Sequence, residues 1–148
     1  MSGNTPDEVF EYMGNGQSVP KDVVSVVFHP SVVEVGDKEF WGCSSLKEVV
    51  FNEGLVKTGE DAFYGCDSLQ SITIPSSVVE IGDYGFDSCI NLREVVCSGV
   101  LPKIGSSTFN DCSALERITF PNISTRLEAI IEAGQVDIQN KVQEYVNR

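Results

Sequence analysis

Four cysteines are spaced regularly along the chain: Cys43, Cys66, Cys89 and Cys112 lie 23 residues apart. If successive copies of this segment stack, their Cα atoms come within about 5 Å, a distance that permits a disulfide, and clustered thiols can also bind zinc. We expect buried free thiols instead, because side chains of one column point the same way into an apolar interior, whereas zinc needs four converging ligands. Five cysteines without a C-x-x-C pair also predict reduced thiols inside a cell, with redox or metal use as the alternative.

An acidic column has the same spacing: Asp37, Glu60 and Asp83 follow one another, and Ser106 ends the row. Such carboxylates could hold a hard cation such as calcium, but most rows of this kind are solvated turns, so we expect no metal. A catalytic triad or a histidine metal site would have to use His29, the single histidine, which we expect at the surface. Since phosphate-binding glycine motifs are also missing, the sequence predicts neither an enzyme nor a cofactor.

The elements that must position these residues repeat with the same period, which is typical of a solenoid. Three further columns contain one residue type each: Phe40, Phe63, Phe86 and Phe109; Leu46, Leu69, Leu92 and Leu115; Gly36, Gly59, Gly82 and Gly105. After each Leu, apolar residues alternate with polar ones in the pattern L-x-x-[VI]-x-[FI], which predicts a strand. Strands that recur in one direction with about 18 residues between them must pair in parallel.

These patterns predict a stack of coils with a parallel sheet on one face and short strands or turns on the other. A second pair of apolar columns, which begins with Val32 and Val35, supplies the other face. The repeated glycine follows at the bend, where a left-handed or crowded backbone would exclude a Cβ atom. No single copy can cover its own apolar side, so neighbouring coils must share one interior.

Residues 68–92 (SLQSITIPSSVVEIGDYGFDSCINL) and 32–46 (VVEVGDKEFWGCSSL) resemble BspA-type leucine-rich repeats. The resemblance covers roughly residues 20 to 123, and its Phe-x-x-Cys-x-x-Leu element recurs four times without a gap. Thr58 and Cys97 depart from the family pattern, which has apolar residues at both positions. The resemblance implies a leucine-rich repeat solenoid that contacts its partners through the strand face.

The repeats divide the chain into three predicted parts. Residues 1–22 are expected to form an N-terminal cap, residues 23–123 about four and a half repeats, and residues 124–148 a C-terminal helical cap. Two β-prone runs, Val9–Met13 and Val23–Phe28, predict a short strand or hairpin over the first coil. Caps are needed because a solenoid otherwise exposes an apolar disc at each end.

Charge restricts the class of partner. Ten Lys and Arg against 22 Asp and Glu give a net charge of −12, so a nucleic acid or an anionic membrane would be repelled. No apolar run reaches membrane-spanning length, and the first residues lack the pattern of a secretory signal. We therefore expect an intracellular, cytoplasmic protein, or an extracellular one if the chain is a fragment of an exported protein.

The exposed face of the predicted sheet is the remaining candidate site. Alternate residues of each strand must point outward, and those expected to contact a partner are Val27, Glu48, Val50, Ser71, Thr73, Glu94, Val96, Arg117 and Thr119. These outward residues vary between copies while the inward ones stay constant, which favours a noncatalytic module that binds a basic or neutral protein. The alternatives are a structural or adhesive repeat segment of a larger surface protein and a thiol-based redox protein.

Overall fold

Short strands recur in every 23-residue copy of the computed structural model, which describes residues 8–14, 16–99 and 102–119. The first strand is β1 (Val9–Tyr12). One side of the stack, the front, then carries β2 (Ser25–Phe28), β4 (Glu48–Val50), β6 (Ser71–Ile74), β8 (Glu94–Cys97) and β10 (Arg117–Thr119). The back carries β3 (Glu34–Val35), β5 (Lys57–Thr58), β7 (Glu80–Ile81) and β9 (Lys103–Ile104).

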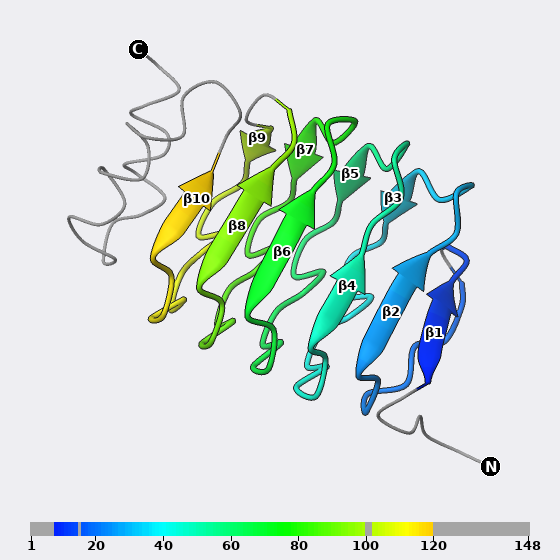
Figure 1. Cartoon of the computed structure of the whole chain (residues 1–148), viewed down its shortest axis with the longest axis horizontal. Helices are drawn as coiled ribbons and strands as arrows, with labels where there is room; N and C mark the ends of the chain where they lie inside the picture. Colours follow the sequence, from blue (N-terminus) through cyan, green and yellow to red (C-terminus); the bar gives the residue numbers. More distant parts are fainter. Residues whose placement is uncertain (1–7, 15, 100–101, 120–148) are drawn as a thin grey trace.

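All the paired strands are parallel, and their register follows the sequence period. Ser25 lies opposite Glu48, and Ser71 lies opposite Glu94, each pair being 23 residues apart. Figure 1 shows the front strands side by side with the shorter back strands behind them, so each copy makes one coil. The predicted solenoid is therefore confirmed over the described residues, whereas the expected helix of residues 124–148 lies outside them.

The front sheet differs from the single sheet that we expected. It consists of two parts, β1-β2-β4 and β6-β8-β10, while the back sheet β3-β5-β7-β9 is continuous (Figure 1). In two other coils the equivalent residue donates its N–H to the preceding coil: His29 to the Tyr12 carbonyl at 3.0 Å and Ser98 to the Ile74 carbonyl at 2.9 Å. Pro75 occupies this position after β6 and has no N–H, so that closing bond cannot form between β6 and β4.

The N-terminal segment extends the front sheet. β1 pairs in parallel with β2, so it is the predicted strand, while a hairpin would have required antiparallel pairing. Tyr12 is fully buried and its ring lies 5.2 Å from that of Phe40, which covers this end of the Phe column. Its hydroxyl donates to Glu39 Oε1 at 2.9 Å, and burial raises the pKa of Tyr12 above its usual range.

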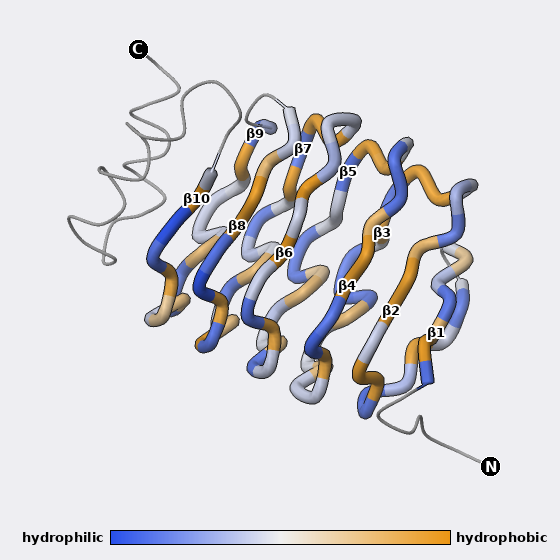
Figure 2. Tube along the Cα trace, in the orientation of Figure 1, coloured by the Kyte–Doolittle hydropathy of each residue, from blue (hydrophilic) through white to orange (hydrophobic). Residues whose placement is uncertain are grey.

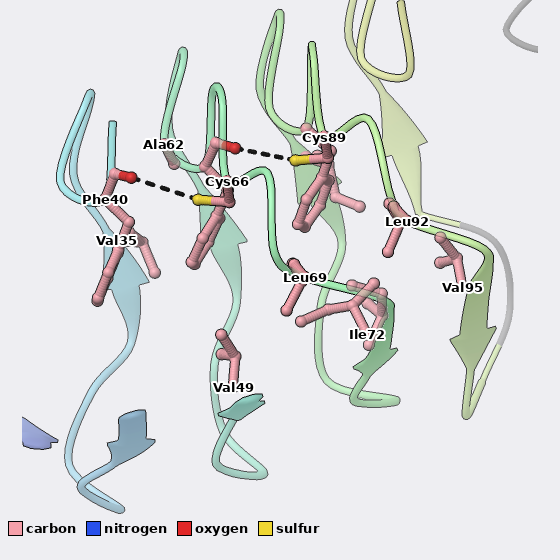
Figure 3. Packing of buried hydrophobic residues seen from close by; sticks show 14 of the residues in the cluster. Val35, Phe40, Val49, Ala62, Cys66, Leu69, Ile72, Cys89, Leu92 and Val95 are labelled. Carbon is pink, nitrogen blue, oxygen red and sulfur yellow. Dashed lines mark hydrogen bonds between the residues drawn. The ribbon is translucent and has the colours of Figure 1, made fainter. Parts of the chain in front are cut away.

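The Phe column forms the centre of the interior. Phe40, Phe63, Phe86 and Phe109 stack with centroids 4.9, 5.3 and 6.0 Å apart and with ring planes inclined by only 8°. Aliphatic residues from both sheets surround the rings (Figure 3). Orange hydrophobic segments recur at equivalent places of successive coils in Figure 2, as an interior shared between neighbours requires.

The repeated glycines allow two coils to approach closely. A Cβ atom on Gly82 would lie 2.6 Å from the carbonyl carbon of Gly59, and one on Gly105 would lie 2.5 Å from the Asp83 nitrogen. Crowding is therefore the reason for these two glycines. Left-handed residues come two positions after the repeated glycines: Asp61 (φ 55°) after Gly59 and Tyr84 (φ 57°) after Gly82, and the backbone N–H of each donates to the next coil.

Thr58 has a buried hydroxyl in the column that otherwise holds Val35, Ile81 and Ile104. Its side chain is 2% exposed, and its Oγ1 atom has no hydrogen-bond partner. We expect Thr58→Val to raise the free energy of unfolding by about 1 kcal/mol, because valine has the same shape without the unsatisfied hydroxyl. Urea denaturation of both proteins measures this change, and a loss of stability would contradict the account.

Candidate functional site

The regularly spaced cysteines lie inside the stack as free thiols. Each thiol approaches a carbonyl of the preceding coil: Cys66 Sγ donates to the Phe40 oxygen at 3.4 Å, Cys89 to Phe63 at 3.1 Å, and Cys112 to Phe86 at 3.0 Å. Figure 3 shows the first two of these bonds. The column thus cross-links successive coils through hydrogen bonds, a role that the spacing alone did not predict.

We expect these thiols to be unreactive in the native protein. Burial raises the pKa of Cys97 to about 12 and that of Cys112 above its usual range, so little thiolate exists near neutral pH. Titration with a thiol reagent should therefore modify almost none of the five cysteines in buffer and all of them in denaturant. Rapid modification of any thiol in buffer would show that its coil opens.

Two members of the acidic column, Asp37 and Asp83, have a structural role. Asp37 Oδ1 accepts the N–H of Glu60, and Asp83 Oδ1 accepts that of Ser106, both at 2.8 Å. Each carboxylate therefore joins one coil to the next. Within the described ranges, no three His, Cys, Asp or Glu side chains are grouped as metal ligands.

His29 makes one contact that resembles catalytic chemistry. Its Nδ1 atom lies 2.7 Å from Ser31 Oγ and 3.1 Å from the Ser31 nitrogen, within a single turn. Across the part of the chain that the structure describes, no carboxylate is hydrogen-bonded to the other ring nitrogen of His29, which a Ser-His-Asp triad would need. The pair is thus explained by local turn geometry.

The back sheet carries a polar groove of about 610 Å³. Its outward residues alternate in charge along the stack: Glu34, Lys57, Glu80 and Lys103 lie opposite one another in register. Lys57 Nζ lies 3.7 Å from Glu34 Oε2, and both side chains are about half exposed. Alternation of sign neutralises this column within the chain itself.

The front sheet presents the predicted contact residues to solvent. None of the nine is buried, and Val50 is the most exposed of the apolar ones, at 51%. Val27, Val50, Thr73, Val96 and Thr119 form one outward column, and Ser25, Glu48, Ser71, Glu94 and Arg117 form the other. The split between β4 and β6 divides both columns, which the sequence did not indicate.

One end of this face is charged and includes residues that sequence reasoning missed. Arg93 lies 3.1 Å from Glu116, and Arg117 lies 3.5 Å from Glu94, around a shallow depression of about 250 Å³. Arg93 and Glu116 immediately precede β8 and β10 and occupy one column of the repeat. Their shared position immediately before a strand is the sequence feature that could have predicted this ion pair.

A second exposed apolar column lies at the corner that leads to the back sheet. Val33, Val56 and Val79 are 61%, 39% and 60% exposed, and their backbones are joined in series by hydrogen bonds. From the sequence, only their buried neighbours were expected, as part of the interior. The repeated Val-Val pairs at 32–33 and 78–79 were the signal for this stripe.

The coils, the stacked Phe column and the cysteine column define a leucine-rich repeat solenoid. A family model described as BspA type leucine-rich repeat region matches residues 19–131 in six copies. The chain therefore belongs to the BspA-type leucine-rich repeat family. This family is typically noncatalytic. Comparison with functionally curated proteins gives no match.

Solved structures show the same fold. A leucine-rich repeat protein from Bacteroides ovatus is 32% identical with a TM-score of 0.65, and the match covers 84% of this chain and 33% of that one. The T. pallidum leucine-rich repeat protein is 33% identical with a TM-score of 0.65, covering 76% of this chain and 52% of that one. The pneumococcal vaccine antigen PcpA, at 22% identity and a TM-score of 0.50 over 76% of this chain and 34% of that one, is similar in fold alone.

The chain thus spans about a third and about half of the two more similar proteins. Within the described ranges, no helix has the length and hydrophobicity that crossing a membrane would require.

Proposed function

We propose that the chain is a noncatalytic repeat segment of a larger surface protein and that its front sheet contacts a protein partner. The observation that carries the first part is the coverage: the segment matches a third to a half of two longer repeat proteins. Membership of a repeat family that is typically noncatalytic supports a scaffold role and not an enzymatic one. An autonomous binding module, which uses the same face, is the second candidate.

The buried thiols are compatible with a surface location. All five cysteines are buried, and the four in the regular column point toward carbonyl groups of preceding residues instead of toward one another. Free cysteines that are shielded in this way do not need a reducing compartment to stay unpaired. Their presence, which at first favoured a location inside the cell, therefore leaves an extracellular one open.

The front sheet is a suitable contact surface because it combines apolar and charged positions. Val50 and its neighbours in the outward column offer area that a partner can desolvate, whereas the ion pair between β8 and β10 can fix orientation. The net charge of −12 favours a basic or neutral partner, whose association should weaken as salt rises.

A matched pair of double variants tests this surface. Val50→Lys with Val96→Lys places two charges on the front column, and Val33→Lys with Val79→Lys places two on the corner stripe at the same spacing. We expect the front pair to reduce capture of a specific partner from the source proteome by more than about tenfold, since buried charge disrupts a desolvated contact. Quantitative mass spectrometry of captured proteins measures this loss.

The corner pair is the control for added charge and should capture the partner as well as the unmodified chain. Loss with the corner pair alone would place the contact on the Val33, Val56 and Val79 stripe and reject the front sheet. Capture of the same proteins by all three would mean that the segment acts only as a structural repeat.

A further inference from the structure

A short stack of two aromatic rings lies on the turn side of the coils, between the back sheet and the front sheet. Trp41 and Tyr64 occupy one column of the repeat, and their rings lie parallel, with centroids 5.8 Å apart and planes inclined by 9°. Trp41 is 45% exposed, so this stack is not part of the interior. Asp87 and Asn110 occupy the same column in the next two coils.

One end of the stack already carries a cation. Lys21 lies over the Trp41 ring, with Nζ 5.4 Å from the centroid, and it also donates to the Trp41 carbonyl. The negative face of an aromatic ring attracts a cation. The Trp41 end of this column is therefore occupied by a cation–π contact within the chain itself.

The other end of the stack meets a carboxylate that lacks a cation. The Gly65 N–H donates to the Asp87 carbonyl at 2.9 Å, which places the coil of Tyr64 directly beside that of Asp87. Asp87 is 5% exposed, and its Oδ1 atom is held by Ser88 Oγ at 2.9 Å and by Asn110 Nδ2 at 3.4 Å. No ion pair involves Asp87 within the ranges that the structure describes, although a buried aspartate is normally paired.

We propose that Tyr64 and Asp87 form a docking position for an arginine side chain of a protein partner. The guanidinium stacks on the Tyr64 ring as the next layer of the column and directs its N–H groups toward the Asp87 carboxylate. Arginine fits better than lysine because its planar group can stack on the Tyr64 ring while its N–H groups donate to the remaining carboxylate oxygen of Asp87. The net charge of −12 attracts such a partner from a distance.

This position is separate from the front sheet, so it stands or fails independently of the proposed function. The hydrogen-bond partners of Asp87 given above, the Ser88 hydroxyl and the Asn110 amide, are both neutral. The charge of the Asp87 carboxylate would therefore be compensated by the partner's arginine. The site is therefore selective for a cation that can also stack, and not for cations in general.

The experiment titrates the full chain with the peptide acetyl-Gly-Arg-Gly-amide and with its lysine and citrulline counterparts. Amide chemical shifts of Gly65, Asp87 and Ser88, together with the fluorescence of Trp41, the single tryptophan, report on the site. We expect saturable changes with the arginine peptide at roughly millimolar concentrations. The lysine peptide should bind several-fold more weakly, and the uncharged citrulline peptide should not bind.

Two variants and one control test the assignment. Asp87→Asn keeps the acceptor for Ser88 but removes the charge, and it should weaken binding roughly tenfold. Tyr64→Leu keeps an apolar side chain and should abolish the preference for arginine over lysine. Asp61→Asn removes one charge from the same side of the stack and should leave binding unchanged.

Equal losses from Asp87→Asn and Asp61→Asn would reduce the effect to general electrostatic attraction and overturn the proposal. The absence of saturable shifts with the arginine peptide would overturn it as well. Because the shift spectrum also reports folding, a variant that unfolds is recognised directly, and the peptide series on the unmodified chain then decides.

Discussion

Phe63→Ala should lower the free energy of unfolding by about 3–5 kcal/mol. The Phe63 ring is fully buried and stacks on a Phe ring from each neighbouring coil, 4.9 Å from Phe40 and 5.3 Å from Phe86. Its removal leaves a cavity that the two rings cannot fill without shifting entire coils. Urea denaturation followed by circular dichroism measures the loss.

Phe86→Ala serves as the repeat of this experiment one coil later and should lose a similar amount of stability. Val79→Ala is the matched surface control, because that side chain is 60% exposed, and it should change stability by less than about 0.5 kcal/mol. Losses below about 1 kcal/mol at both Phe positions would be incompatible with a shared interior built on this column.

Gly82→Ala should cost roughly 3 kcal/mol or more, although it adds only one methyl group. The new Cβ atom would lie 2.6 Å from the Gly59 carbonyl carbon, 2.7 Å from its oxygen and 2.8 Å from the Glu60 nitrogen. All three are backbone atoms of the preceding coil, so no side chain can rotate away. Relief requires that β5 and β7 separate, which weakens the continuous back sheet.

Gly42→Ala separates this crowding from backbone conformation. Gly42 has a φ of 73°, but nothing lies within 4 Å of its added Cβ atom. We expect a cost of about 1–2 kcal/mol, which is that of a left-handed residue with a side chain. If Gly82→Ala were no worse than Gly42→Ala in thermal or urea unfolding, close approach between coils would not explain the glycine column.

The repeating part of the fold could be predicted because every coil imposes the same demand on the same column. Parallel pairing, the register of 23 residues, the Phe stack and the buried cysteines all follow from one period. Outward residues of the front strands followed equally from alternation, since a side chain beside an inward one in a strand must face the other way.

Features that do not repeat in every coil depend on individual residues and on the contacts that those residues make with neighbouring coils. The break between β4 and β6 coincides with Pro75, which has no N–H to donate to the preceding coil. Asp37 and Asp83 were expected to be solvated turn residues, whereas in the structure each accepts an N–H from the following coil.

By itself, the sequence determined which residues face inward, because burial of an apolar side is required in every copy and leaves a periodic trace. Only the tertiary structure decided what the remaining residues contact across coils. Cys66 donates to Phe40, Lys21 covers Trp41, and Asp87 lies buried without a cation in the described residues. Such contacts join residues about 20 or more positions apart, and they depend on distances and directions that a one-dimensional pattern does not contain.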